Sequence, residues 1–87
     1  MGEITVEYHS NAMAATKRIS EKFIVPDGGL KASLLKKAIL AQYPNTGLDS
    51  VMESCRWIVD GVSIDPSGSH VLKDGDDVML IPRMTGG

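Results

Sequence analysis

Few residues in this chain have types and spacing suited to chemistry, and they form no self-contained active site. The sequence contains no GxxxxGK[ST] phosphate loop, no GxGxxG motif after a strand, no HExxH motif and no CxxC pair. Its two histidines, His9 and His70, fall in predicted loops without a second ligand at metal spacing, and we interpret them as solvated loop residues. We therefore expect no catalysis by the chain's own side chains.

Cys55 is the single cysteine, and it alternates with Trp57 and Val59 along a predicted strand. This spacing places all three on the inward face. Cys55 is then more simply a small buried residue than a nucleophile, and Trp57 is more simply a core anchor than a ligand-stacking platform.

The most informative group is the end of the printed sequence, Gly86-Gly87. With glycine at its usual frequency, a random chain ends in two glycines roughly once in 200, and a frayed terminus needs no functional explanation. Glycine nevertheless suits a tail that enters another protein's site, because it lacks a Cβ and allows close approach to its backbone. The candidate reactive group is the carboxyl group of Gly87. We expect a flexible tail over 83–87, which consists of Arg83, Met84, Thr85, Gly86 and Gly87.

Composition limits the class of protein. The 87 residues allow one domain, which we place at 1–82, and the 43% apolar and 23% charged fractions are typical of a globular protein. A net charge of −2 argues against nucleic-acid binding. The apolar runs are too short to cross a bilayer, and one cysteine without a leader sequence predicts a cytoplasmic location.

Apolar periodicity predicts an α+β fold. Residues 3–8 and 19–25 alternate as two strands of a wide hairpin around an irregular segment, 9–17, and a mainly apolar helical stripe runs from 30 to 43. The stripe consists of Leu30, Leu34, Leu35, Ala38, Ile39 and Gln42.

Pro44 should end this helix, and 45–54 should form a loop. Strands at 56–59 and 62–64 flank the tight turn Asp60-Gly61, and a last strand covers 78–81. One helix should therefore cover one face of a mixed sheet of four to five strands.

Three segments carry a family resemblance: WIVDG at 57–61, LKDGDDVMLIP at 72–82 and TGG at 85–87. The chain resembles the ubiquitin-like sulfur carriers, with the molybdopterin synthase small subunit closest and the thiamine-pathway carrier nearer in mechanism than in sequence. The match is strong over 55–87 and only architectural over 1–50. Asp60 replaces the family's frequent Asn, and Arg83-Met84 replaces a frequent proline and small apolar residue.

The resemblance implies a ubiquitin-like β-grasp fold and a carrier that is acted upon, not an enzyme. It implies that an activating adenylyltransferase of the ubiquitin-activating type uses ATP to adenylate Gly87, and that a persulfide sulfur then displaces AMP to leave a thiocarboxylate. The sulfur would pass to a synthase or its large subunit in cofactor biosynthesis, as for the molybdenum cofactor. The carrier itself would bind no cofactor or metal.

Three outward strand positions form a candidate docking patch. Ile58, Met79 and Ile81 alternate with inward residues, and alignment on the ubiquitin tail places the same positions outward. A covering loop would explain them equally well. Two other functions stay open: Arg83 resembles the arginine near ubiquitin's tail and favours a modifier joined to lysines through Gly87, and a β-grasp binding module with an incidental tail is the third reading.

Overall fold

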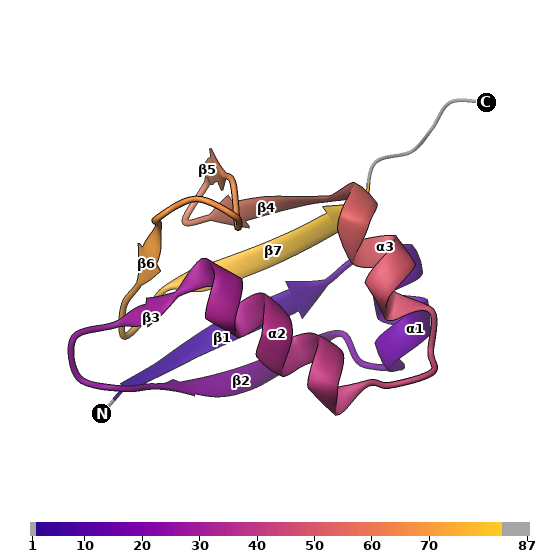
Figure 1. Ribbon diagram of the computed structural model, residues 1–87, viewed down its shortest axis with the longest axis horizontal. Helices are drawn as coiled ribbons and strands as arrows, with labels where there is room; N and C mark the ends of the chain where they lie inside the picture. The colour runs from indigo at the N-terminus through magenta and orange to yellow at the C-terminus, as the bar shows by residue number, and fades with distance from the viewer. Residues whose placement is uncertain (1, 83–87) are drawn as a thin grey trace.

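The computed structural model describes residues 2–82, and residues 1 and 83–87 lie outside the described part. Seven strands and three helices are present in that part, in the chain order that Figure 1 shows. The strands are β1 (Gly2–Tyr8), β2 (Ser20–Val25), β3 (Leu30–Lys31), β4 (Cys55–Val59), β5 (Val62–Ile64), β6 (Val71–Leu72) and β7 (Asp77–Pro82). The helices are α1 (Asn11–Thr16), α2 (Ala32–Gln42) and α3 (Leu48–Ser54).

Five strands form one mixed sheet in the order β2-β1-β7-β4-β5. The central β1 and β7 run parallel, with Val6 opposite Val78, whereas the other neighbours are antiparallel. Two short strands, β3 and β6, pair separately at one end of the molecule. The predicted α+β class and mixed sheet are confirmed.

The core lies between the sheet and α2, which crosses one face of the sheet in Figure 1. Strand alternation buries every second residue, as expected for a sheet covered on one face. Trp57 is 1% exposed, so its predicted role as a core anchor is confirmed. The inward residues of the sheet are Ile4, Val6, Tyr8, Val25, Trp57, Val59, Val78 and Leu80, and α2 contributes Ala32, Leu35 and Ile39.

The predicted helix was wrong in its start and in part of its buried stripe. Leu30 and Lys31 pair with Leu72 and Val71 in the β3–β6 ladder, and the helix begins at Ala32. Leu34 is 49% exposed, because the helix turns the Ala32, Leu35 and Ile39 side toward the sheet.

Two predicted loops contain short helices. In α1 the buried Thr16 donates a hydrogen bond from Oγ1 to the carbonyl of Ala12 (3.0 Å), and in α3 the buried Leu48 and Met52 lie one turn apart. Helices this short depend on tertiary packing for their stability. The residues of 9–17 and 45–54 are mostly small or polar and show no apolar period, so the sequence did not predict these two helices.

The predicted hairpin at Asp60-Gly61 is confirmed. Val59 lies opposite Val62, and both turn residues have positive φ, 50° at Asp60 and 85° at Gly61. Two consecutive positive φ angles define the type I′ turn that suits the twist of an antiparallel pair. The turn sets the register of β5 against β4.

Candidate functional site

Strand β7 leads directly to the predicted reactive tail. It lies between β1 and β4, and its last residue, Pro82, is opposite Cys55 at the start of β4. The five tail residues lie outside the described part of the chain, as does the predicted boundary between domain and tail. The reactive role of Gly87 and the accompanying roles of Gly86, Thr85, Met84 and Arg83 therefore stay predictions.

Ile58, Met79 and Ile81, which we call the apolar patch, lie together on the sheet face opposite α2. Ile58 is directly opposite Met79 across the β4–β7 ladder, and Ile81 follows Met79 on the same face of β7. All three side chains are partly exposed. The patch lies beside Pro82, where the described chain ends, and its docking role stays a prediction.

Charged residues border the patch. Arg56 lies opposite Ile81, and Glu7 lies opposite Met79 on the other side of β7. The pKa of Glu7 is raised, mainly by a side-chain hydrogen bond with the adjacent Asp77. Desolvation and charge repulsion from Asp77 raise it further, whereas His9 opposes the shift. Asp77 Oδ1 is buried and accepts no hydrogen bond from another described residue. Sequence reasoning missed this carboxylate pair, because Glu7 and Asp77 meet only through the parallel pairing of β1 with β7.

Replacing Glu7 by Gln should stabilise the domain at neutral pH. The folded state raises the pKa of Glu7, so it favours the protonated form; the associated stability is present below the unfolded pKa of about 4.3 and is lost as pH rises. Gln supplies a permanent donor to Asp77 without charge. Thermal unfolding between pH 3.5 and 7.5 should show a melting temperature above wild type at pH 7 and a smaller difference at pH 3.5.

The gain at pH 7 should be below about 1 kcal/mol, because water screens this surface pair. Glu3→Gln is the control on the same strand and face, since Glu3 lies opposite Ile24 and contacts the Asp74 carboxylate through its backbone N–H, which the substitution leaves in place. A difference between Glu7→Gln and wild type that stays constant with pH would contradict the proton-sharing interpretation.

Cys55 packs against the core on the inward side of β4, as predicted, whereas His9 differs from its predicted environment. Cys55 is half-buried, and burial raises the pKa of its thiol to about 11 although Lys36 opposes the shift. The thiol is therefore protonated at neutral pH and is a poor nucleophile, despite its place opposite Pro82.

His9 Nε2 is buried without a hydrogen-bond partner in the described chain, so the solvated interpretation of this residue was wrong. Residues 2–82 contain no group of three or more His, Cys, Asp or Glu placed to hold a metal ion.

Glu21 joins three elements through a hydrogen-bonded cluster that the sequence did not indicate. Tyr8 and Tyr43 both donate from their hydroxyls to Glu21 Oε1, at 3.0 and 2.5 Å, and Gln42 donates to Oε2. Burial and the nearby Glu21 carboxylate raise the pKa of Tyr8 above its usual range. The cluster fastens the end of α2 to β1 and β2, and we interpret it as structural.

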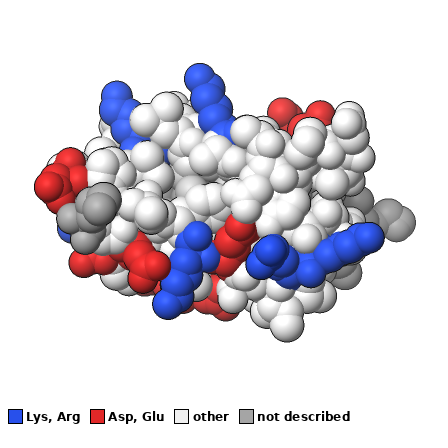
Figure 2. Space-filling view, turned by 90° about the horizontal axis from the view of Figure 1, so that it is seen from below, with Lys and Arg blue, Asp and Glu red and all other residues white. Residues whose placement is uncertain are grey.

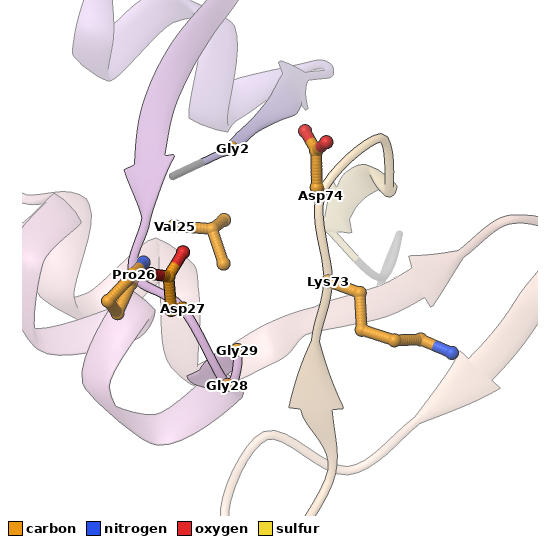
Figure 3. A pocket seen from close by; sticks show the side chains of 8 residues that line it. All are labelled: Gly2, Val25, Pro26, Asp27, Gly28, Gly29, Lys73 and Asp74. Atoms are coloured by element: carbon orange, nitrogen blue, oxygen red, sulfur yellow. The ribbon is translucent and has the colours of Figure 1, made fainter.

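A pocket of about 440 Å³ lies at the other end of β7 from Pro82. In Figure 3 the Asp74 and Asp27 side chains border its opening, whereas Lys73 points away from it. The lining residues are Gly2, Val25, Pro26, Asp27, Gly28, Gly29, Lys73 and Asp74. None belongs to the apolar patch or the tail, so this pocket is separate from the candidate site.

Comparison with known proteins decides the family. The chain is 33% identical over 85 residues to a molybdopterin synthase sulfur carrier subunit of Chlamydomonas reinhardtii, covering 98% of this chain and 99% of that protein. The chain belongs to the family of molybdopterin synthase sulfur carrier subunits. No protein-family model matches the sequence.

Solved structures agree on the fold of this family member. Small archaeal modifier protein 1 (SAMP1) of Methanosarcina acetivorans is similar with a TM-score of 0.77 and 21% identity, covering 100% of this chain and 98% of that one. A complex of subunits 1 and 2 of the molybdopterin-converting factor from Helicobacter pylori contains a chain that is similar with a TM-score of 0.60 and 26% identity, covering 98% and 99%. The ubiquitin-like β-grasp prediction is confirmed. Within residues 2–82, no helix has the length and apolar character that a membrane span requires.

Proposed function

We propose that this chain is a sulfur carrier that works through the carboxyl group of Gly87. An adenylyltransferase of the ubiquitin-activating type would join AMP from ATP to that carboxylate, which is otherwise a poor electrophile. A persulfide sulfur would then displace AMP and, after a thiol cleaves the S–S bond, leave a thiocarboxylate. The observation that carries the proposal is the relation to a sulfur carrier subunit along nearly the whole chain, together with the terminal Gly86-Gly87.

The proposed sulfur acceptor is bound by the large subunit of a synthase in molybdenum cofactor biosynthesis. The Helicobacter pylori complex joins two subunits of a molybdopterin-converting factor, which supports a two-subunit arrangement for this chain as well. The carrier then supplies the sulfur, and its partners supply the catalytic groups. No cofactor need be bound to the carrier, because ATP is used in the partner's site.

The apolar patch and the tail suit joint binding to a partner. Each tail residue that becomes ordered costs about 1–2 kcal/mol in backbone entropy, which a glycine tail alone cannot recover through side-chain contacts. Burial of Ile58, Met79 and Ile81 beside Pro82 would offset that cost. The charged border formed by Arg56, Glu7 and Asp77 would fix the orientation of the partner.

The direct test is the intact mass of the protein from its native cell, with fragmentation to locate any change. We expect the mass gain for one oxygen replaced by one sulfur, located at Gly87. A free carboxylate at Gly87 in cells that are making the cofactor would argue against the carrier.

A ubiquitin-like modifier is the second candidate, because a structural neighbour is named small archaeal modifier protein 1. Both functions begin with adenylation, and they differ afterwards. A modifier would produce higher bands on a denaturing gel, and fragments of Gly87 would be found on lysines of other proteins. Absence of such conjugates together with a thiocarboxylate would favour the carrier.

Ile58→Asp should slow adenylation of Gly87 at least about 10-fold without unfolding the domain. A buried carboxylate at the centre of the docking contact would be left without a partner, which commonly costs more than about 1.4 kcal/mol. The rate can be measured by ATP–pyrophosphate exchange with the activating enzyme. Val62→Asp is the control, because Val62 is 63% exposed on the edge strand β5 and lies outside the patch. An unchanged rate would contradict the docking role, and loss of the circular dichroism spectrum would show that Ile58 belongs to the core.

A further inference from the structure

Strand β2 is an edge of the sheet with unpaired backbone groups. Its only strand neighbour within residues 2–82 is β1. The carbonyl of Ile19 accepts a hydrogen bond from Tyr8 N (2.8 Å), so the alternation of an antiparallel ladder turns the backbone groups of Ser20, Lys22 and Ile24 to the outer edge. These three N–H and C=O pairs could hydrogen-bond a further strand.

Exposed apolar side chains lie on both sides of this edge. Ile24 is 67% exposed on the open sheet face, and Leu34 is 49% exposed on α2. Ala38 and Leu34 lie one and two turns before Gln42, which reaches β2 through its hydrogen bond to Glu21, so this flank of α2 faces the β2 edge. Figure 2 is seen from the side on which β2 lies, and a band without charged side chains crosses the centre of that face.

Basic residues lie at and before the start of the strand. Lys17 and Arg18 lie just before β2, and Lys22 is exposed on its open face, whereas Lys31 lies at the start of α2, away from the start of β2. In Figure 2, Lys and Arg side chains lie above and below the uncharged band, and acidic side chains lie at one end and also between the basic side chains below the band. This arrangement favours a partner strand with apolar residues at its centre and acidic residues beside Lys22 and Arg18.

A second copy of the chain is the other possible occupant of this edge. Two antiparallel β2 strands in one continuous sheet can pair five residues of Ser20–Val25 in two registers. One register places Lys22 opposite Lys22, and like charges directly opposite each other destabilise a pair, whereas the other places Phe23 opposite Phe23. In either register a second copy would bring a second set of the basic residues Lys17, Arg18 and Lys22 to the edge, so these charges favour an acidic partner of a different kind.

We propose that the β2 edge surface, formed by Ser20, Lys22, Ile24, Leu34 and Ala38, binds an extended segment of a partner protein as a sixth strand. The segment has alternating apolar residues and acidic flanks. Backbone hydrogen bonds supply affinity, and the side chains beside the edge supply specificity. This contact is separate from the apolar patch, which lies near β4 and β7, so both surfaces can be occupied at the same time.

The experiment titrates the full, isotopically labelled chain with a capped nine-residue peptide, Asp-Asp-Val-Thr-Val-Thr-Val-Asp-Asp. The comparison peptides carry Lys at every Asp position or Pro at the central Val. We expect the amide signals of Ser20, Lys22 and Ile24 to shift with the acidic peptide, and affinity to fall at least about 10-fold with either comparison peptide. Lys22→Glu and Ile24→Ser should each weaken binding at least about 3-fold, consistent with one lost edge contact.

The control variant Val62→Ser removes an exposed apolar residue from the opposite edge strand, β5, and should bind as wild type does. No shift of the β2 amides at millimolar peptide would overturn the proposal. Equal binding of the Lys peptide, or β2 shifts that depend on protein concentration without peptide, would also overturn it. The titration involves no adenylation, so its failure would leave the proposed role of Gly87 unaffected.

Discussion

Adding one alanine after Gly87 is expected to reduce thiocarboxylate formation at least about 100-fold. The added residue converts the Gly87 carboxylate into an amide and moves the free carboxylate onto a residue with a Cβ. A displacement of about 1 Å at a reacting centre can cost about 100-fold in rate, and one residue moves the carboxylate much farther. The measurement is the yield of thiocarboxylate by intact mass after incubation with the activating enzyme, ATP and a sulfur donor.

The matched control carries the same alanine directly after Met1, at the other end of the chain. It should accept sulfur at the wild-type rate, and both variants should melt at the wild-type temperature because neither change enters the described domain. Equal sulfur transfer by the two variants would refute both the carrier and the modifier, and would leave the binding-module reading.

Gly29→Ala should cause the largest loss of stability of any single methyl addition considered. Gly29 has φ +96°, and an added Cβ would lie 2.4 Å from Val71 Cγ1 and 2.8 Å from the carbonyl oxygen of Leu72. Strain in this backbone region costs about 1 kcal/mol, and overpacking adds about 1–3 kcal/mol. We expect the free energy of unfolding to fall by about 2–4 kcal/mol in urea denaturation.

Gly28→Ala is an adjacent control that separates the two causes. Gly28 has φ +91°, and its added Cβ would meet no atom within 4 Å. This variant should therefore lose only the backbone component, about 1 kcal/mol. Equal losses in the two variants would show that the β3–β6 pair moves aside without cost, contrary to the close approach at Gly29.

The success of the sequence-based predictions depended on the length and periodicity of each element. Alternating apolar residues in β1, β4 and β7 predicted both the strands and their inward faces, because one buried face imposes a period of two. The six-residue α1 and the two-residue β3 and β6 are too short to show a period, and they form only where tertiary partners exist. Leu34 was predicted as a core residue because it is apolar and neighbours Leu35 in the helix. Which of the two faces the sheet is known only once the buried face of α2 is known.

The outward positions were predictable from sequence because each strand defines its own two faces. Ile58, Met79 and Ile81 were identified from strand alternation together with the resemblance to ubiquitin, and their outward positions follow from the same alternation that buries Trp57 and Leu80. The Glu7–Asp77 pair depends on a parallel contact between strands from opposite ends of the chain. The Glu21 cluster likewise depends on β1, β2 and α2 meeting, and a lone glutamate in an apolar strand does not reveal its partners.

The central place of β7 connects folding to synthesis on the ribosome. Glu3 N donates to Asp74 Oδ1 from 71 residues away, and the first strand then runs beside the last in the middle of the sheet. A nascent chain that lacks β7 leaves β1 and β4 without their shared neighbour, so the domain cannot close until nearly all of it has left the ribosome. Chains truncated before β7 would therefore stay unfolded and be degraded by proteases. A chain that reaches an activating enzyme in folded form must have been synthesised at least as far as the strand that leads to Gly87.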